Sequence, residues 1–203
     1  MRLNSTVKQR AARTISYLLM PTTFAFVAFL LLTFFTRQHT DKLTVAGVSL
    51  LFGAVLPFGY LYFLLRKEKV TQIDVPIRQQ RTVPYLISVV IYLIGSLVLY
   101  IMGASVTVYA LMVCYATNTL VVSLINTQWK ISAHATGASG PLTALALTFG
   151  WLLLPFFLIV ILVAWARVEL KAHTPAQVVA GAFLGIVLTA AQVEALYKIA
   201  GAK

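Results

Sequence analysis

Two of the three histidines in this chain lie at the borders of long apolar runs, close to basic and hydroxyl residues. His134 ends the tetrapeptide Ile131-Ser132-Ala133-His134, and His173 follows Arg167 after five intervening residues. Near neutral pH a histidine can act as a nucleophile or as a general acid. Arginine binds phosphate through a planar fork of N–H donors. These residue types together indicate phosphoryl-transfer chemistry.

The same regions supply further groups that a phosphate site needs. The candidate phosphate-binding side chains are Arg78, Arg81, Arg167, Lys171 and the hydroxyl of Ser132. Each of them alone has a simpler interpretation, because basic residues commonly anchor helix ends to anionic headgroups. A histidine before Thr174-Pro175 likewise suits an ordinary helix start. The case for chemistry therefore rests on spacing.

Most of the remaining side chains are apolar. It is 60% hydrophobic and 10% charged, whereas a soluble domain has about 25% charged residues. No charged residue occurs from Thr82 to Trp129, from Ile131 to Ala166 or from Ala172 to Val193. Apolar stretches of about 20 residues are typical of transmembrane helices. We expect an all-α, polytopic transmembrane bundle of six to seven helices, with a basic leader at 1–14 and a single membrane domain at 15–203.

The apolar runs predict where the helices lie. We expect helices at 15–36, 43–65, 84–103, 105–125 and 174–199, and a loop of small residues at 126–140. The run at 141–166 allows two interpretations, either one helix kinked at Pro155 or a hairpin broken near Gly150. One helix would put His134 and His173 on opposite membrane faces, and a hairpin would put them on the same face.

The charge distribution bears on topology and partners. The net charge of +11 comes from basic residues clustered near helix ends, which favours lipid headgroups over nucleic acid as the partner. The basic N-terminus predicts a cytoplasmic start, and we expect a bacterial cytoplasmic (inner) membrane. The lone Cys114 cannot form an internal disulfide. The sequence leaves open whether the chain forms a homo-oligomer or belongs to a membrane complex.

The spacing of two segments resembles a known family. Arg167, five residues, His173, three residues and Gln177 resemble the third motif of the type 2 phosphatidic acid phosphatase (PAP2) superfamily, S-R-x5-H-x3-D. The segment 131–134 resembles its second motif, P-S-G-H. The intervening residues 135–166 suit a connection through two helices, which favours the hairpin.

The first motif of that family, K-x6-R-P, is only partly matched. Arg81 and Pro84 resemble its arginine and proline with a two-residue slip, and Asp74 stands at the position of the lysine. Gln177 stands where the third motif has aspartate. An amide can accept the hydrogen bond that this aspartate accepts from the histidine, but it supplies no negative charge.

The resemblance implies a metal-independent lipid phosphatase or phosphotransferase with a PAP2-like fold and no cofactor. Its substrate would be a lipid phosphate or a polyprenyl diphosphate. The implied roles are nucleophile for His173, general acid for His134, orienting acceptor for Gln177, and phosphate binding for Arg167, Arg81 and Ser132. The alternative is a PAP2-fold protein without turnover, which binds lipid or serves as a structural subunit of a membrane complex.

Overall fold

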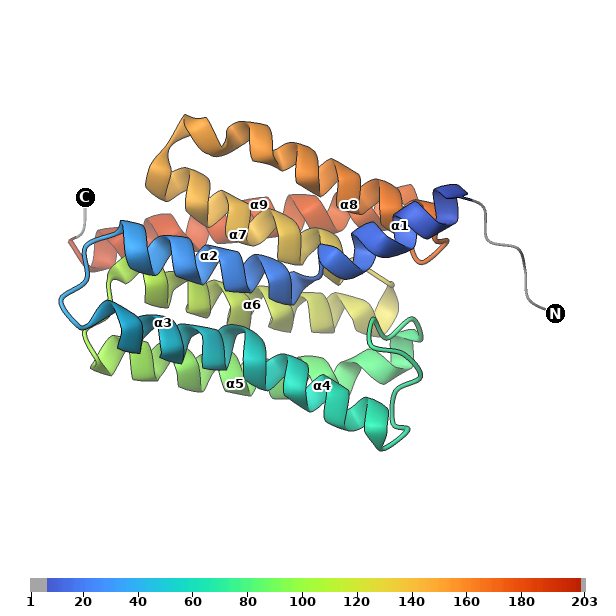
Figure 1. The fold of residues 1–203 in the computed structure, drawn as a ribbon, viewed down its shortest axis with the longest axis horizontal. Coiled ribbons are helices and arrows are strands. Elements are labelled where there is room, and N and C mark those ends of the chain that lie inside the picture. Colours follow the sequence, from blue (N-terminus) through green and yellow to red (C-terminus); the bar gives the residue numbers. More distant parts are fainter. Residues whose placement is uncertain (1–6, 202–203) are drawn as a thin grey trace.

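The computed structural model describes residues 7–201, which are mostly helical and contain no β-strand (Figure 1). Its α-helices are α1 (Val7–Leu18), α2 (Pro21–Phe35), α3 (Lys42–Leu50), α4 (Leu56–Arg66), α5 (Thr82–Ile101), α6 (Val106–Gln128), α7 (Ala133–Phe149), α8 (Leu158–Glu169) and α9 (Pro175–Ile199). A π-helical turn, Leu51–Val55, joins α3 to α4, and 3-10 turns at Arg78–Arg81 and Trp151–Phe157 precede α5 and α8. For these residues the prediction of an all-α fold is confirmed.

Several of these helices are long and apolar enough to cross a membrane. The described residues contain five such spans, or six if the bent pair α1–α2 is one span. The helix α7, with 17 residues, is too short to be counted among them. These spans support the prediction of a polytopic membrane protein. Successive passes run antiparallel, so the start of α1 and the α4–α5, α6–α7 and α8–α9 connections all lie at one end (right in Figure 1). We call this end the polar end.

The single helix expected at 15–36 is two helices in the structure. They meet at a bend of 44°, because Pro21 at the start of α2 has no N–H to continue the preceding helix. The helix α1 begins at Val7, so residues 7–14 of the expected leader are helical, and residues 1–6 lie outside the described residues. Ala12 and Ser16 of α1 are buried, and α1 packs against α8.

The run 141–166 forms a hairpin. Gly150, at φ +87°, ends α7 in a conformation that favours glycine, and a 3-10 turn with Pro155 then leads into α8. The two helices run side by side in opposite directions (Figure 1). The expected loop at 126–140 is wrong, because α6 continues to Gln128 and α7 already begins at Ala133. The small residues of this stretch serve helix packing.

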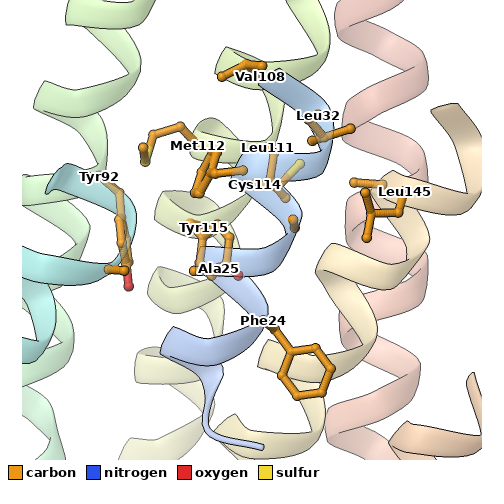
Figure 2. Packing of buried hydrophobic residues seen from close by; sticks show 14 of the residues in the cluster. Phe24, Ala25, Leu32, Tyr92, Val108, Leu111, Met112, Cys114, Tyr115 and Leu145 are labelled. Atoms are coloured by element: carbon orange, nitrogen blue, oxygen red, sulfur yellow. The ribbon is translucent and has the colours of Figure 1, made fainter. Parts of the chain in front are cut away.

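The buried core fills the middle of the bundle around α6. Figure 2 shows side chains from α2, α5, α6 and α7 meeting there. The ring of Tyr115 lies 5.4 Å from that of Tyr92 and 5.8 Å from that of Phe29, measured between centroids. Aromatic pairs at such separations add stability beyond the burial of their area. The core thus packs α6 against α2, α5 and α7.

The helices α7 and α9 approach closely through small residues. The hydroxyl of Thr136 donates to the carbonyl of Gly181 at 2.9 Å, and that of Ser139 donates to the carbonyl of Ala182 at the same distance. A Cβ atom on Gly185 would lie 2.1 Å from Ser139 Oγ and 2.8 Å from the carbonyl oxygen of Thr136. Small residues of this kind allow membrane helices to approach each other and exchange hydrogen bonds. The contact fixes α7 relative to α9, and hence His134 relative to His173.

The substitution Gly185→Ala tests this contact. We expect it to destabilise the protein by about 1–3 kcal/mol, because the added methyl group forces α7 and α9 apart. The measurement is the thermal midpoint of unfolding in detergent. Gly47→Ala is the matched control, since a Cβ there meets no atom within 4 Å and alanine favours a helix. Equal midpoints for the two variants would contradict this packing.

Candidate functional site

The most buried charged side chain is Arg167, in the last turn of α8. It is 0% exposed, and its Nη1 donates to Ser16 Oγ at 2.8 Å and to Asp74 Oδ2 at 3.0 Å. Its Nε and Nη2 atoms are also buried and have no hydrogen-bond partner among the described residues. A buried charge is tolerated when it is paired and hydrogen-bonded. In Arg167, Nη1 therefore has hydrogen-bond partners in the protein, whereas Nε and Nη2 can donate to an anion.

A second buried arginine, Arg81, lies in the 3-10 turn before α5. Its Nε donates to the carbonyl of Val75 at 2.7 Å, and its Nη1 donates to that of Ile131 at 3.4 Å. Val75 has φ +41°, which is unusual for a β-branched residue and stores strain. Arg81 holds this strained peptide in place. It thereby ties the segment 67–77 to the short connection between α6 and α7.

His173 lies between α8 and α9 and is also buried. Its Nδ1 is 3.1 Å from the carbonyl oxygen of Lys130. A carbonyl only accepts, so Nδ1 carries the proton and the lone pair of the ring is on Nε2. Burial, and then the positive charges of Arg81 and Arg167, lower the pKa of His173 to about 3. The imidazole is therefore neutral at pH 7, the form in which Nε2 can act as a nucleophile.

His134 lies in the first turn of α7 on the other side of the same cluster. Its Nε2 is buried without a partner among the described residues, and Arg167, His173 and Arg81 all lie within electrostatic range of its ring. The ammonium group of Lys130 is nearby as well. Its pKa is lowered by partial burial and by repulsion from Arg81 and Arg167. The cluster is thus strongly positive, with Asp74 as its acidic member.

Four residues of this cluster, His134, His173, Arg81 and Asp74, line one part of a cavity of about 170 Å³, whereas Arg167 and Lys130 are not among its lining residues. These four residues form its polar part, at the polar end of the bundle. Further along, most of the lining side chains are apolar and come from the α1–α2 bend and from α4, α5, α6 and α7; they include Met20, Pro21, Pro57, Phe58, Leu61, Pro84, Tyr92, Leu111, Tyr115, Val122 and Pro141. A charged end joined to an apolar chamber suits a molecule with an anionic head and a hydrocarbon tail.

No family model, curated protein or solved structure matches this chain. Function must therefore be inferred from the side chains and their geometry.

The structure brings four of the predicted site residues together, namely His134, His173, Arg81 and Arg167. Two others hold backbone instead. Ser132 caps α7, where its Oγ accepts from the N–H of Ala135 at 3.3 Å, and it does not line the cavity. Arg78 donates to carbonyls at the end of α6, with Nη1 3.0 Å from the oxygen of Asn126. The sequence assigned both to phosphate, but in the structure Ser132 Oγ accepts a hydrogen bond at the start of α7 and Arg78 Nη1 donates to backbone carbonyls.

Gln177 has a different role from the one its spacing suggested. Its Oε1 accepts from the N–H of Thr174 at 3.1 Å, while its own N–H donates to Thr174 Oγ1 at 3.3 Å. This is a capping box at the start of α9. The acceptor beside His173 is the carbonyl of Lys130. A backbone group therefore occupies the position expected for the Gln177 side chain.

Sequence reasoning missed three contributors to the cluster. Asp74 was noted only as a departure from a motif, although a buried Arg167 requires a carboxylate and Asp74 is the only acidic residue between Glu68 and Glu169. Ser16 lies 151 positions from its partner Arg167. Lys130 acts through its backbone carbonyl, which no pattern of side chains can reveal.

The lowered pKa of His173 predicts how stability depends on pH. Between the folded value of about 3 and an unfolded value of about 6.5, the unfolded chain binds a proton that the folded chain does not. Stability therefore falls as the pH drops below about 6.5. We expect His173→Asn, whose amide can still donate to the Lys130 carbonyl, to reduce the loss of thermal midpoint between about pH 7.5 and about pH 5 in detergent. An identical loss in both proteins would contradict a buried, neutral His173.

Proposed function

We propose that this protein is an integral membrane enzyme that removes or transfers the phosphate of a lipid phosphate through a phosphohistidine intermediate, as its resemblance to the PAP2 superfamily implies. One observation carries the proposal. The buried, unpaired donors of Arg167 lie beside two histidines, one of which is held neutral with its Nε2 lone pair available.

Binding comes first. The phosphate dianion is held by Arg167 Nε and Nη2 and by Arg81, whose other N–H groups are anchored to backbone carbonyls. Because the arginines are held in place before the ligand arrives, little reorganisation is needed when charge develops on the phosphoryl oxygens. The dianion also offsets the positive charges around His134 and favours its protonated form.

The chemical steps then use the two histidines. His173 Nε2 attacks phosphorus, the bond from phosphorus to the lipid oxygen breaks, and His134 gives its proton to that oxygen. Water next attacks the phosphorus and gives a proton to His134, the P–N bond breaks, and inorganic phosphate leaves. The Lys130 carbonyl keeps His173 in the correct tautomer, the orienting task that a carboxylate performs in other histidine pairs.

The apolar part of the cavity supports a lipid as substrate. Phosphatidic acid, phosphatidylglycerol phosphate and polyprenyl diphosphate all combine an anionic head with a hydrocarbon tail. The proposed membrane is a bacterial inner membrane, and the charges favour a site at its cytoplasmic face, on the side of the N-terminus. Basic residues are concentrated at the polar end and include Lys8, Arg10, Arg13, Arg66, Lys67, Lys69, Lys130 and Lys171. The opposite end of the described bundle carries Arg37, Lys42 and Lys198, and basic loops remain in the cytoplasm.

A second candidate is a lipid-phosphate-binding protein without turnover, alone, as a homo-oligomer or as a subunit of a membrane complex. Two observations favour it. Asp74 already pairs with Arg167, so a phosphate must share that arginine with a carboxylate. The acceptor beside His173 is a neutral carbonyl, which stabilises a developing imidazolium less than a carboxylate does.

Phosphate release from a panel of lipid phosphates in detergent separates the two candidates. We expect release by the wild-type protein and a loss of at least about a thousandfold in His173→Ala, because the nucleophile is removed. His39→Ala, at the opposite end of the bundle, is the matched control and retains activity. A labelled protein that is stable to base and labile to acid identifies the phosphohistidine. Binding without release above the His173→Ala level would reject the enzyme in favour of the second candidate.

A further inference from the structure

The carboxylate of Asp74 lies inside the proposed phosphate site. Its Oδ2 is 3.0 Å from Arg167 Nη1, and Asp74 lines the cavity together with His134, His173 and Arg81. Its Oδ1 is buried and has no hydrogen-bond partner among the described residues. A buried carboxylate oxygen without a donor is costly, and the cost increases when a phosphate binds next to it. A ligand that supplies a donor as well as a phosphate would remove both penalties.

The segment that carries Asp74 is held firmly. The next carbonyl, that of Val75, accepts from Arg81 Nε at 2.7 Å. The side chain of Val75 is buried against Leu64 and Val70. The carboxylate of Asp74 is therefore held by Arg167, and the adjoining backbone at Val75 is held by Arg81. The carboxylate cannot leave the cavity without breaking its contact with Arg167.

We propose that Asp74 is a specificity-determining residue, which accepts a hydrogen bond from a hydroxyl or ammonium group next to the phosphate ester of the ligand. The inference rests on the proposed function, because it takes the phosphate to be bound by Arg81 and Arg167. One guanidinium–carboxylate pair contacts both groups of the ligand, so the donor must lie within a few bonds of phosphorus. The ligand class is a β-hydroxy or β-amino phosphomonoester with a hydrocarbon tail.

This class separates lipids that otherwise look alike. In phosphatidic acid the carbon next to the phosphate ester carries an acyl group and offers no donor. A lysolipid phosphate or a terminal glycerophosphate headgroup offers a hydroxyl at that position, and a long-chain amino-alcohol phosphate offers an ammonium. The ammonium would also neutralise the carboxylate charge, so it gains a charge-assisted hydrogen bond. The hydroxyl and ammonium sources are distinguished by separate probes.

Binding to the full chain in detergent tests the inference with three probes. They are 1-oleoyl-glycerol-3-phosphate, its analogue without the 2-hydroxyl group, and sphingosine phosphate. We expect the wild-type protein to bind the first and third about tenfold to a hundredfold more tightly than the analogue, as one hydrogen bond to a charged group implies. In Asp74→Ala this ratio falls to about one. Asp41→Ala, at the start of α3 on the opposite end, is the matched control and keeps the wild-type ratio.

The ratio of affinities is the decisive quantity, because a merely structural loss would weaken all three probes alike. Asp74→Asn provides a second variant that retains an acceptor but no charge. We expect it to keep the preference for the hydroxyl and to lose the added preference for the ammonium. Equal binding of the hydroxyl probe and its analogue by the wild-type protein would overturn the inference. Failure of the wild-type protein to bind any probe or inorganic phosphate would overturn the phosphate site itself.

Discussion

A buried guanidinium is the constraint around which the polar end is organised. Arg167 has no exposed surface, so its charge must be met by groups brought from elsewhere in the chain. Ser16 comes from α1, 151 positions away, and Asp74 comes from the segment between α4 and α5, 93 positions away. These two contacts join α1, the segment between α4 and α5, and the α7–α8 hairpin at one place. Replacing one partner would leave a buried charge uncompensated.

Breaks between helices bring Arg167 and its partners to the same end of the bundle. The hairpin at Gly150 returns α8 to the end where α7 begins, so Arg167 and His134 share a face of the bundle. The bend at Pro21 turns α1 onto α8, which brings Ser16 to Arg167. Close packing of α7 on α9 then sets the two histidines relative to each other. Each break is encoded by a residue that cannot continue a helix or that adopts a positive φ.

The sequence predicted the parts of the structure that the membrane enforces. A helix satisfies its own backbone in lipid, so the apolar runs located α5, α6 and α9 to within a few residues. The bend at Pro21 was hidden because the run is apolar on both sides of it. The residues 133–140 were expected to form a loop because small and hydroxyl residues are common in loops, yet in membrane helices they serve packing.

The site was predictable where spacing reflects topology, and it was missed where long-range partners decide. His134, Arg167 and His173 converge because their loops share one end. Gln177 was assigned to His173, although Thr174-Pro175-Ala176-Gln177 is also the pattern of a capping box. The Gln177 side chain can either cap α9 or accept from His173, and in the structure it caps α9. Asp74 and Arg167 are 93 positions apart and meet only in the folded chain. No local sequence pattern predicts such a pair.

The most direct test of a single phosphate site is an experimental structure of the protein with orthovanadate, which mimics a phosphoryl group in transfer. The geometry predicts vanadium bonded to His173 Nε2, with its oxygens on Arg167 and Arg81 and one oxygen facing His134. Vanadate bound elsewhere, or Arg167 paired with Asp74 and Ser16 alone at saturating vanadate, would contradict the assignment of this cluster to phosphate.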